Sequence, residues 1–125
     1  MEEMEHIREM FIDESLDLLQ EMESALNQLK AAPENAEMLN LVFRAAHTIK
    51  GSAGLFGDDG YDAIVSFTHT VENVLAQVRS GERACDDDLI LTLLDCRDHI
   101  ESLIEQLNID DASSSQELAQ QGQEL

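Results

Sequence analysis

Apolar residues recur at helical spacing in four stretches that together cover most of the 125-residue chain. These stretches are residues 4–31, 36–54 and 62–80, and a fourth that runs from the acidic residues 86–88 to about residue 107. Positions three and four apart share one face of a helix, so each stretch predicts a helix with one buried stripe. Four such helices with short connections predict an all-α fold, an antiparallel four-helix bundle with up-down topology. The inward positions expected for the first helix are Met4, Ile7, Phe11, Leu18, Met22, Ala25 and Leu29.

The residues between the stretches are typical of helix ends. Pro33 interrupts the first helix, and Asn35 offers an N-cap to the second. Residues 57–60 (GDDG) predict a loop, and Gly81 ends the third helix. The aspartates at 86–88 suit the N-terminus of the fourth helix, where carboxylates meet the helix dipole.

The chain becomes polar from Asp110 onward, where Ser, Gln and Ala replace the apolar stripe. This change predicts a helical-bundle domain over residues 1–109. It also predicts a tail over residues 110–125, which is either a linker or a weak, short fifth helix at the C-terminus.

The charge balance restricts the partners that this surface can bind. The chain has 27 acidic and 7 basic residues, for a formal charge of −20. Such a surface repels nucleic acid and anionic membranes and attracts proteins with basic docking surfaces. No apolar run approaches the roughly 20 residues needed to span a bilayer, and the first ten residues are too charged for a signal peptide. We expect Cys85 and Cys96 to be reduced thiols. We therefore expect a cytoplasmic protein without nucleic-acid binding or membrane insertion.

His47 is the most informative candidate for chemistry, because of where it lies on its helix. At about 100° per residue, with Val42 at the centre of the apolar stripe, His47 falls about 140° from the centre, outside the stripe. Lys50, Gly51 and Gly54 lie on the same side. Glycine inside a helix costs about 1 kcal/mol relative to alanine, so two glycines beside one exposed imidazole indicate function. Without side chains, they leave the ring accessible to a large protein surface.

The third helix repeats this arrangement with His69 and Glu72, which fall about 160° and 100° from its own apolar centre at Val71. If the two helices are antiparallel neighbours, these residues border one seam with His47. A carboxylate bonded to one ring nitrogen fixes the tautomer and leaves the other nitrogen as a nucleophile. Lys50 can stabilise the charge of an arriving phosphoryl group.

Other motif-like features are weaker. Residues 51–57 (GSAGLFG) lack the Gly-Lys-Ser/Thr ending of a phosphate loop, and residues 58–60 lack the spaced carboxylates of a calcium loop. Glu3 and His6 have the spacing of a di-iron ligand pair, but such a site needs a second copy and two further glutamates. His6 and His99 read as plain surface histidines. A metal-binding bundle and a non-catalytic helical adaptor that docks through its acidic face remain the alternatives.

Three segments together resemble a known family. Residues 47–54 (HTIKGSAG) look like the phosphorylation motif of histidine-phosphotransfer (Hpt) domains. Residues 69–73 (HTVEN) resemble the N-terminal phosphotransfer domain of CheA-type chemotaxis histidine kinases, and residues 11–19 (FIDESLDLL) are similar to its first helix. The likeness covers about residues 7–108, and the connection over residues 57–62 is longer and more acidic than is usual for the family.

The resemblance implies a role for each candidate residue. His47 would accept the phosphoryl group, Glu72 would accept a hydrogen bond from its Nδ1–H, and Lys50 and His69 would complete the polar network. It also implies a fifth helix formed by the tail.

The resemblance further implies a phosphoryl carrier in a two-component pathway that is not an enzyme on its own. A separate kinase domain would supply the γ-phosphoryl of ATP, and an aspartate of a response-regulator receiver domain would take it. ATP and Mg²⁺ would be used by these partner domains, and no cofactor would be bound here. Gly51 and Gly54 are the expected docking positions.

Overall fold

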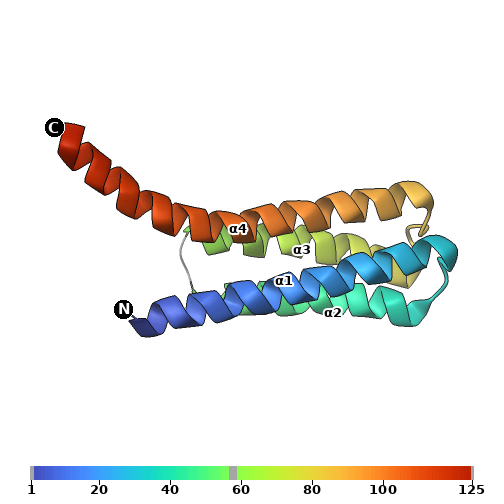
Figure 1. The fold of residues 1–125 in the computed structure, drawn as a ribbon. Coiled ribbons are helices and arrows are strands. Elements are labelled where there is room, and N and C mark those ends of the chain that lie inside the picture. Colours follow the sequence, from blue (N-terminus) through green and yellow to red (C-terminus); the bar gives the residue numbers. More distant parts are fainter. Residues whose placement is uncertain (1, 57–58, 125) are drawn as a thin grey trace.

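The protein is a bundle of four long helices (Figure 1). A computed structural model describes residues 2–56 and 59–124. The helices are α1 (Glu2–Ala31), α2 (Ala36–Ala53), α3 (Asp59–Ser80) and α4 (Asp87–Glu124). α1 contacts α2 and α4, and α3 contacts the same two helices. The α1–α2 and α3–α4 turns lie at one end of the bundle and both termini at the other, which confirms the antiparallel up-down topology (Figure 1).

The predicted cap Asn35 and the predicted acidic start of α4 both appear in the structure. The side-chain oxygen of Asn35 accepts hydrogen bonds from the backbone N–H groups of Glu37 and Met38, at 3.1 and 3.2 Å. A carboxylate oxygen of Asp86 accepts one from the N–H of Leu89 at 2.8 Å. These side chains satisfy backbone donors that the first turn of a helix otherwise leaves without partners.

α3 begins earlier than the sequence predicted. The loop expected over residues 57–60 is wrong for Asp59 and Gly60, which belong to α3, while Gly57 and Asp58 lie outside the described residues. The ring of the buried Tyr61 packs 4.2 Å from that of Phe56 and 5.4 Å from that of Phe11, measured between centroids. This aromatic cluster holds the first turn of α3 against the segment that follows α2. The helix therefore starts at Asp59, before the apolar positions from which its start was predicted.

α4 continues where a tail was expected. Residues 110–124 are helical and form part of α4. Adding residues to an existing helix avoids the cost of nucleating a new one, and the Gln, Glu, Leu and Ala residues of this segment are good helix formers. The division of the chain into a domain over residues 1–109 and a tail stays a prediction.

The core consists of aliphatic side chains from all four helices, and its register on α1 differs from the predicted one. Leu19 and Leu26 are fully buried, whereas Leu18 is only half-buried and Ile7 is 47% exposed. The remaining expected positions with described side chains, Phe11, Met22, Ala25 and Leu29, are buried as predicted. α1 packs against two helices at once, so its buried face is wider and differently centred than a single stripe suggests.

Arg97 of α4 is a buried cation that joins α4 to α1. Its Nε donates to the backbone carbonyl of Leu19 at 3.0 Å, and Nη1 donates to Asp98 at 2.8 Å and to Glu101 at 2.6 Å. Burial acts to lower the pKa of Arg97, but the hydrogen bonds to Asp98 and Glu101, together with the negative charges of Glu101 and Glu23, outweigh this effect and raise the pKa. The guanidinium therefore stays charged. A buried ion needs partners of opposite charge, and these carboxylates supply them.

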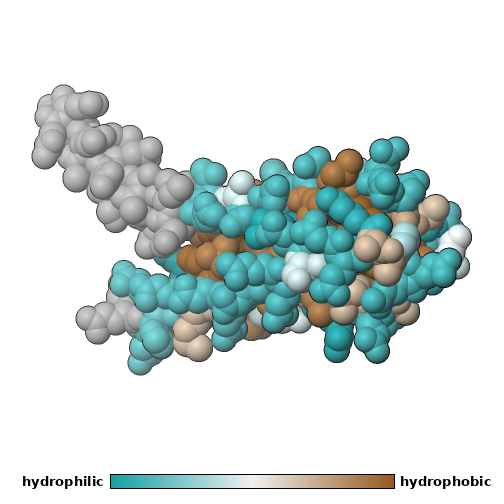
Figure 2. Space-filling model, turned by 45° about the vertical axis from the view of Figure 1, so that its right-hand side comes forward, coloured by the Kyte–Doolittle hydropathy of each residue, from teal (hydrophilic) through white to brown (hydrophobic). Residues whose placement is uncertain are grey.

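The face shown in Figure 2 is largely hydrophilic, with apolar patches between the polar side chains. Cys85 and Cys96 are free thiols. Burial raises the pKa of both, and the negative charge of Asp86 adds to this effect at Cys85, as that of Asp95 does at Cys96. Within the described part of the chain, no helix combines the length and the apolar character needed to cross a membrane.

Candidate functional site

His47 projects from the outer face of α2, as its position outside the apolar stripe predicted. The residues that α2 buries are Val42, Ala45, Ala46, Ile49 and Ala53. The His47 side chain is 63% exposed. A helix that holds its inner face in the core therefore presents this imidazole to solvent on a rigid support.

Glu72 of α3 contacts the imidazole of His47. Its Oε2 lies 3.2 Å from Nδ1 of His47. A carboxylate oxygen accepts hydrogen bonds, so this contact places the proton on Nδ1, which donates a hydrogen bond to Glu72. The other nitrogen, Nε2, then keeps its lone pair, as a nucleophile requires.

Lys50, one turn after His47 on α2, binds the same carboxylate. Its Nζ donates to Oε2 at 3.3 Å and lies 3.1 Å from Oε1. The distance from Nζ to Oε1 is that of an ion pair. This buried oxygen accepts no hydrogen bond in the described structure, so the contact is electrostatic only. The Glu72 and Lys50 side chains are only 10% and 23% exposed, so the ion pair balances a carboxylate that is largely out of water.

The burial of Glu72 is greater than its own helix suggested. At about 100° from the centre of its apolar stripe, it was expected to border an exposed seam. The structure places α2 directly against α3 at this point, and the carboxylate lies between the two helices with its oxygens on His47 and Lys50. A carboxylate packed between two helices has less freedom to move than one at an exposed seam. It therefore holds the ring of His47 in a more fixed orientation.

His69 is the one predicted network residue that the structure does not bring into contact with the others. It lies on α3 one turn before Glu72 and is exposed. The described part of the chain contains no hydrogen bond or ion pair to its ring. Its role in the network stays a prediction.

Phe43 and Arg79 also lie in this region, and neither was predicted from the sequence. The ring of Phe43 lies parallel to that of His47, with 6.4 Å between centroids and an angle of 5° between planes. The guanidinium carbon of Arg79, on α3, lies 4.7 Å from the centroid of the Phe43 ring. Phe43 precedes His47 by four residues, so helix geometry alone gives it the same face. The position of Arg79 depends on how α3 packs on α2.

The backbone of α2 does not require either glycine beside His47. A Cβ atom added to Gly51 meets nothing within 4 Å. At Gly54 it meets only backbone oxygens of Lys50 and Gly51, at the ordinary contact distances of 3.5 and 3.6 Å. Both positions lie on the same side as His47, so their small size keeps the approach to the imidazole open.

Substitutions of Gly51 separate access from structure. Gly51→Ala should stabilise the domain by up to about 1 kcal/mol, because alanine is the better helix former and its methyl group has space. Gly51→Trp should stay folded yet sharply reduce phosphotransfer between proteins, while reaction of His47 with the small donor phosphoramidate changes much less. Thermal unfolding and labelling assays measure these effects. Unfolding by Gly51→Ala, or normal protein transfer by Gly51→Trp, would contradict this role.

The remaining histidines lie in other surroundings. The ring of His99 makes an edge-to-face contact with Phe67 across α3 and α4, at 4.5 Å between centroids. His6 lies near the N-terminus of α1 and is exposed. Among the residues that the structure describes, no group of three or more His, Cys, Asp and Glu side chains is placed to hold a metal ion.

The sequence profile of the Hpt domain matches residues 6–108 of this chain. The chain belongs to the Hpt domain family. The bundle resembles the CheA phosphotransferase domain from Thermotoga maritima, with a TM-score of 0.74 and 33% identity, over 83% of this chain and 95% of that one. It also resembles the phosphorylated P1 domain of CheA3, solved in complex with CheY6 from R. sphaeroides, with a TM-score of 0.73 and 27% identity, over 87% and 80% of the two chains.

Curated relatives of this Hpt domain are much longer proteins. The chemotaxis protein CheA of Salmonella typhimurium is 42% identical over 88 residues, which cover 70% of this chain and 13% of that protein. CheA of Bacillus subtilis is 32% identical over 105 residues, which cover 84% of this chain and 15% of that protein. The match therefore assigns this chain to the CheA-type phosphotransfer domains, and the chain spans about one seventh of the length of these relatives.

Proposed function

We propose that this Hpt domain carries a phosphoryl group on Nε2 of His47, between a histidine kinase catalytic domain and the aspartate of a response regulator. The observation that carries the proposal is the 3.2 Å hydrogen bond from Nδ1 of His47 to Glu72, on a ring that is itself 63% exposed. This bond selects the tautomer in which Nε2 is a nucleophile, and the exposure lets that atom reach a second protein.

The same contacts support each bond change in the transfer. The lone pair of Nε2 attacks the γ-phosphorus of ATP held by the kinase domain, the bond to the bridging oxygen breaks, and ADP leaves. Positive charge develops on the ring during this attack, and the Glu72 carboxylate stabilises it through Nδ1–H. Lys50 uses only part of its donor capacity on Glu72, so its ammonium group also offsets the negative charge of the phosphoryl oxygens.

Transfer to the regulator reverses the attack. A carboxylate oxygen of the receiver aspartate attacks phosphorus, and the bond from phosphorus to Nε2 breaks. His47 leaves as the neutral imidazole that it was before phosphorylation, because Nδ1 keeps its proton throughout. The Mg²⁺ that assists this step belongs to the receiver, and the carrier supplies orientation and charge compensation.

We infer the parent protein and its location from the likeness to CheA. A CheA-type kinase many times longer than this domain would supply the ATP site, and its place would be the cytoplasm. The R. sphaeroides relative was solved bound to CheY6, which supports a CheY-type receiver as the partner here.

An apolar groove near the C-terminal end of α2 supports docking of these partners next to Gly51 and Gly54 in the sequence. Between the N-terminal part of α1 and the end of α2 lies an apolar groove of about 410 Å³, whose lining includes Ile7, Met10 and Leu55. Leu55 is 86% exposed, and Ile7 and Met10 are each 47% exposed. Large apolar side chains that gather in the open favour contact with another protein.

Incubation with radiolabelled ATP and the CheA-type kinase catalytic domain tests the proposed function. The chain should take up label from the γ-phosphate and release it to a CheY-type receiver when that protein is added with Mg²⁺. A non-catalytic adaptor would bind its partners without acquiring label, and that result would refute the proposal.

A further inference from the structure

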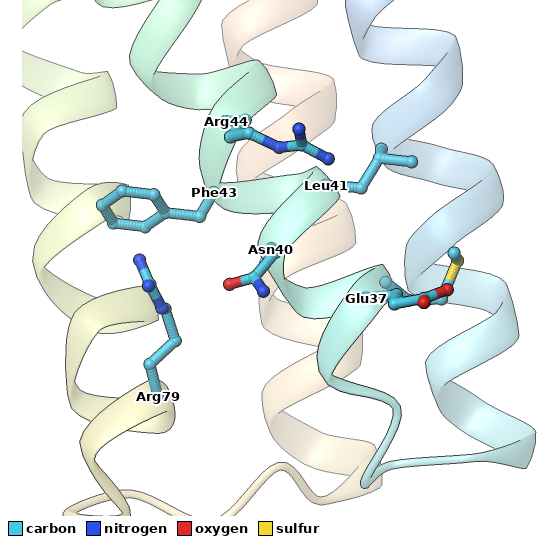
Figure 3. Close-up of a pocket in the computed structure, with 7 residues that line it drawn as sticks. Glu37, Asn40, Leu41, Phe43, Arg44 and Arg79 are labelled. Atoms are coloured by element: carbon cyan, nitrogen blue, oxygen red, sulfur yellow. The ribbon is translucent and has the colours of Figure 1, made fainter.

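A second surface on α2 lies on the side of His47 away from the apolar groove. It is a pocket of about 660 Å³, shown in Figure 3, formed by the first half of α2 and one side chain of α3. Asn40, Phe43 and Arg44 come from α2, and Arg79 comes from the last turns of α3. Arg79 points toward the Phe43 ring in this view. Glu37 contributes a carboxylate to the lining, at the end of the pocket farthest along α2 from His47.

The two arginines of the pocket are exposed cations without acidic partners in the described structure. Neither Arg44 nor Arg79 forms an ion pair with any described carboxylate, in a chain with 27 acidic and only 7 basic residues. Lys50 and Arg97, in contrast, are both engaged by carboxylates. Unpaired guanidinium groups in so acidic a protein leave a local positive surface available to an outside anion.

Arg79 also lies against an aromatic ring. Its guanidinium carbon lies 4.7 Å from the centroid of the Phe43 ring, which is a favourable cation–π distance. A guanidinium that stacks on a ring keeps N–H donors free at its edge, where they can bind a carboxylate in a planar, bidentate manner. The Phe43 ring in turn lies parallel to that of His47, so the cationic pocket adjoins the phosphoryl acceptor.

We propose that this pocket binds an acidic segment of the response-regulator receiver that flanks its phosphoacceptor aspartate. The inference rests on the proposed function and names the surface that engages this one partner. A receiver that holds Mg²⁺ beside its acceptor aspartate does so with carboxylate ligands, so its active-site face is acidic. A carrier with a formal charge of −20 repels such a face, and Arg44 and Arg79 reverse that repulsion where the two proteins must meet.

The test measures transfer from phosphorylated His47 to a purified CheY-type receiver by rapid quench, at several NaCl concentrations. The chain is first phosphorylated with phosphoramidate, so the kinase plays no part. Arg44→Gln and Arg79→Gln should each lower the second-order rate constant by roughly three- to tenfold at low salt. The difference from the original chain should shrink in about 0.5 M NaCl, because salt screens exposed charges. Arg79→Lys, which keeps the charge but loses the stacked, bidentate geometry, should be intermediate.

Lys30→Gln is the matched control, because it removes the same charge from an exposed position in the last turn of α1. It should transfer at the original rate. Equal losses in the control and the arginine variants, or no loss in any, would overturn the proposal. So would slower labelling by the kinase with unchanged transfer to the receiver, which would assign the pocket to the kinase. Slower uptake from phosphoramidate would also overturn it, since the arginines would then act on His47 itself. If the original chain takes no phosphoryl group on His47, it is the proposed function that fails.

Discussion

Replacing His47 with glutamine is expected to abolish phosphorylation of this domain completely. Glutamine keeps the approximate size and polarity of the residue but has no nucleophilic nitrogen. The side chain is exposed on the outer face of α2 and contributes nothing to the core, so helical content and thermal stability should stay unchanged. The measurement is uptake of label from radioactive ATP in the presence of the kinase domain, with circular dichroism to verify the fold.

The chemistry of the product gives an independent check on this assignment. A phosphoryl group on an imidazole nitrogen is a phosphoramidate, so the label on the original chain should be lost in acid and kept in base. The control variants His6→Gln and His99→Gln should each be labelled, because they leave His47 and its hydrogen bond to Glu72 in place. Label that persists in His47→Gln, or that survives acid, would show that another residue is the acceptor.

Glu72→Ala should give the second large effect, a phosphorylation rate about 10–100-fold lower without complete loss. The variant removes the acceptor that holds the proton on Nδ1, so the Nε2–H tautomer gains population and the nucleophilic lone pair is less often available. It also removes the negative charge that stabilises the ring as the new bond forms. Rates come from labelling time courses, and NMR of the His47 ring nitrogens reports the tautomer ratio directly.

Two variants separate orientation from general electrostatics. Glu72→Gln keeps an oxygen acceptor without the charge, so it should retain more activity than Glu72→Ala. Glu82→Ala removes a carboxylate from the exposed connection between α3 and α4, and it should leave both the rate and the tautomer ratio unchanged. If Glu72→Ala also left them unchanged, Glu72 would have no part in the mechanism.

The fold could be predicted in outline because its determinants are local. Spacing of three and four residues gave four helices, and Asn35 and the aspartates at 86–88 marked two of the starts. The errors arose where contacts between helices decide the outcome. Tyr61 packs on Phe11 and Phe56 and moves the start of α3 to Asp59, and Arg97 is buried because Leu19 of another helix offers it a carbonyl.

In the candidate site, too, some features depend on one helix and others on contacts between helices. The exposure of His47 follows from its angle on α2, and the structure confirms it. The low exposure of Glu72 does not follow from α3 alone, because α2 covers that carboxylate. His69 shares the exposed side of α3, yet the described structure gives it no bond to the network.

The sequence by itself determined which residues form helices, which face of α2 carries His47, and which motif surrounds it. Each of these depends on positions within one turn or two of a single helix, where the geometry is fixed at 3.6 residues per turn. Only the resemblance suggested that Nδ1 of His47 meets Glu72, 25 residues away, and the tertiary structure decided the geometry of that contact and the position of Arg79 over Phe43. These contacts depend on the register and rotation of α3 against α2, which are set by how the whole core packs and not by the periodicity of either helix.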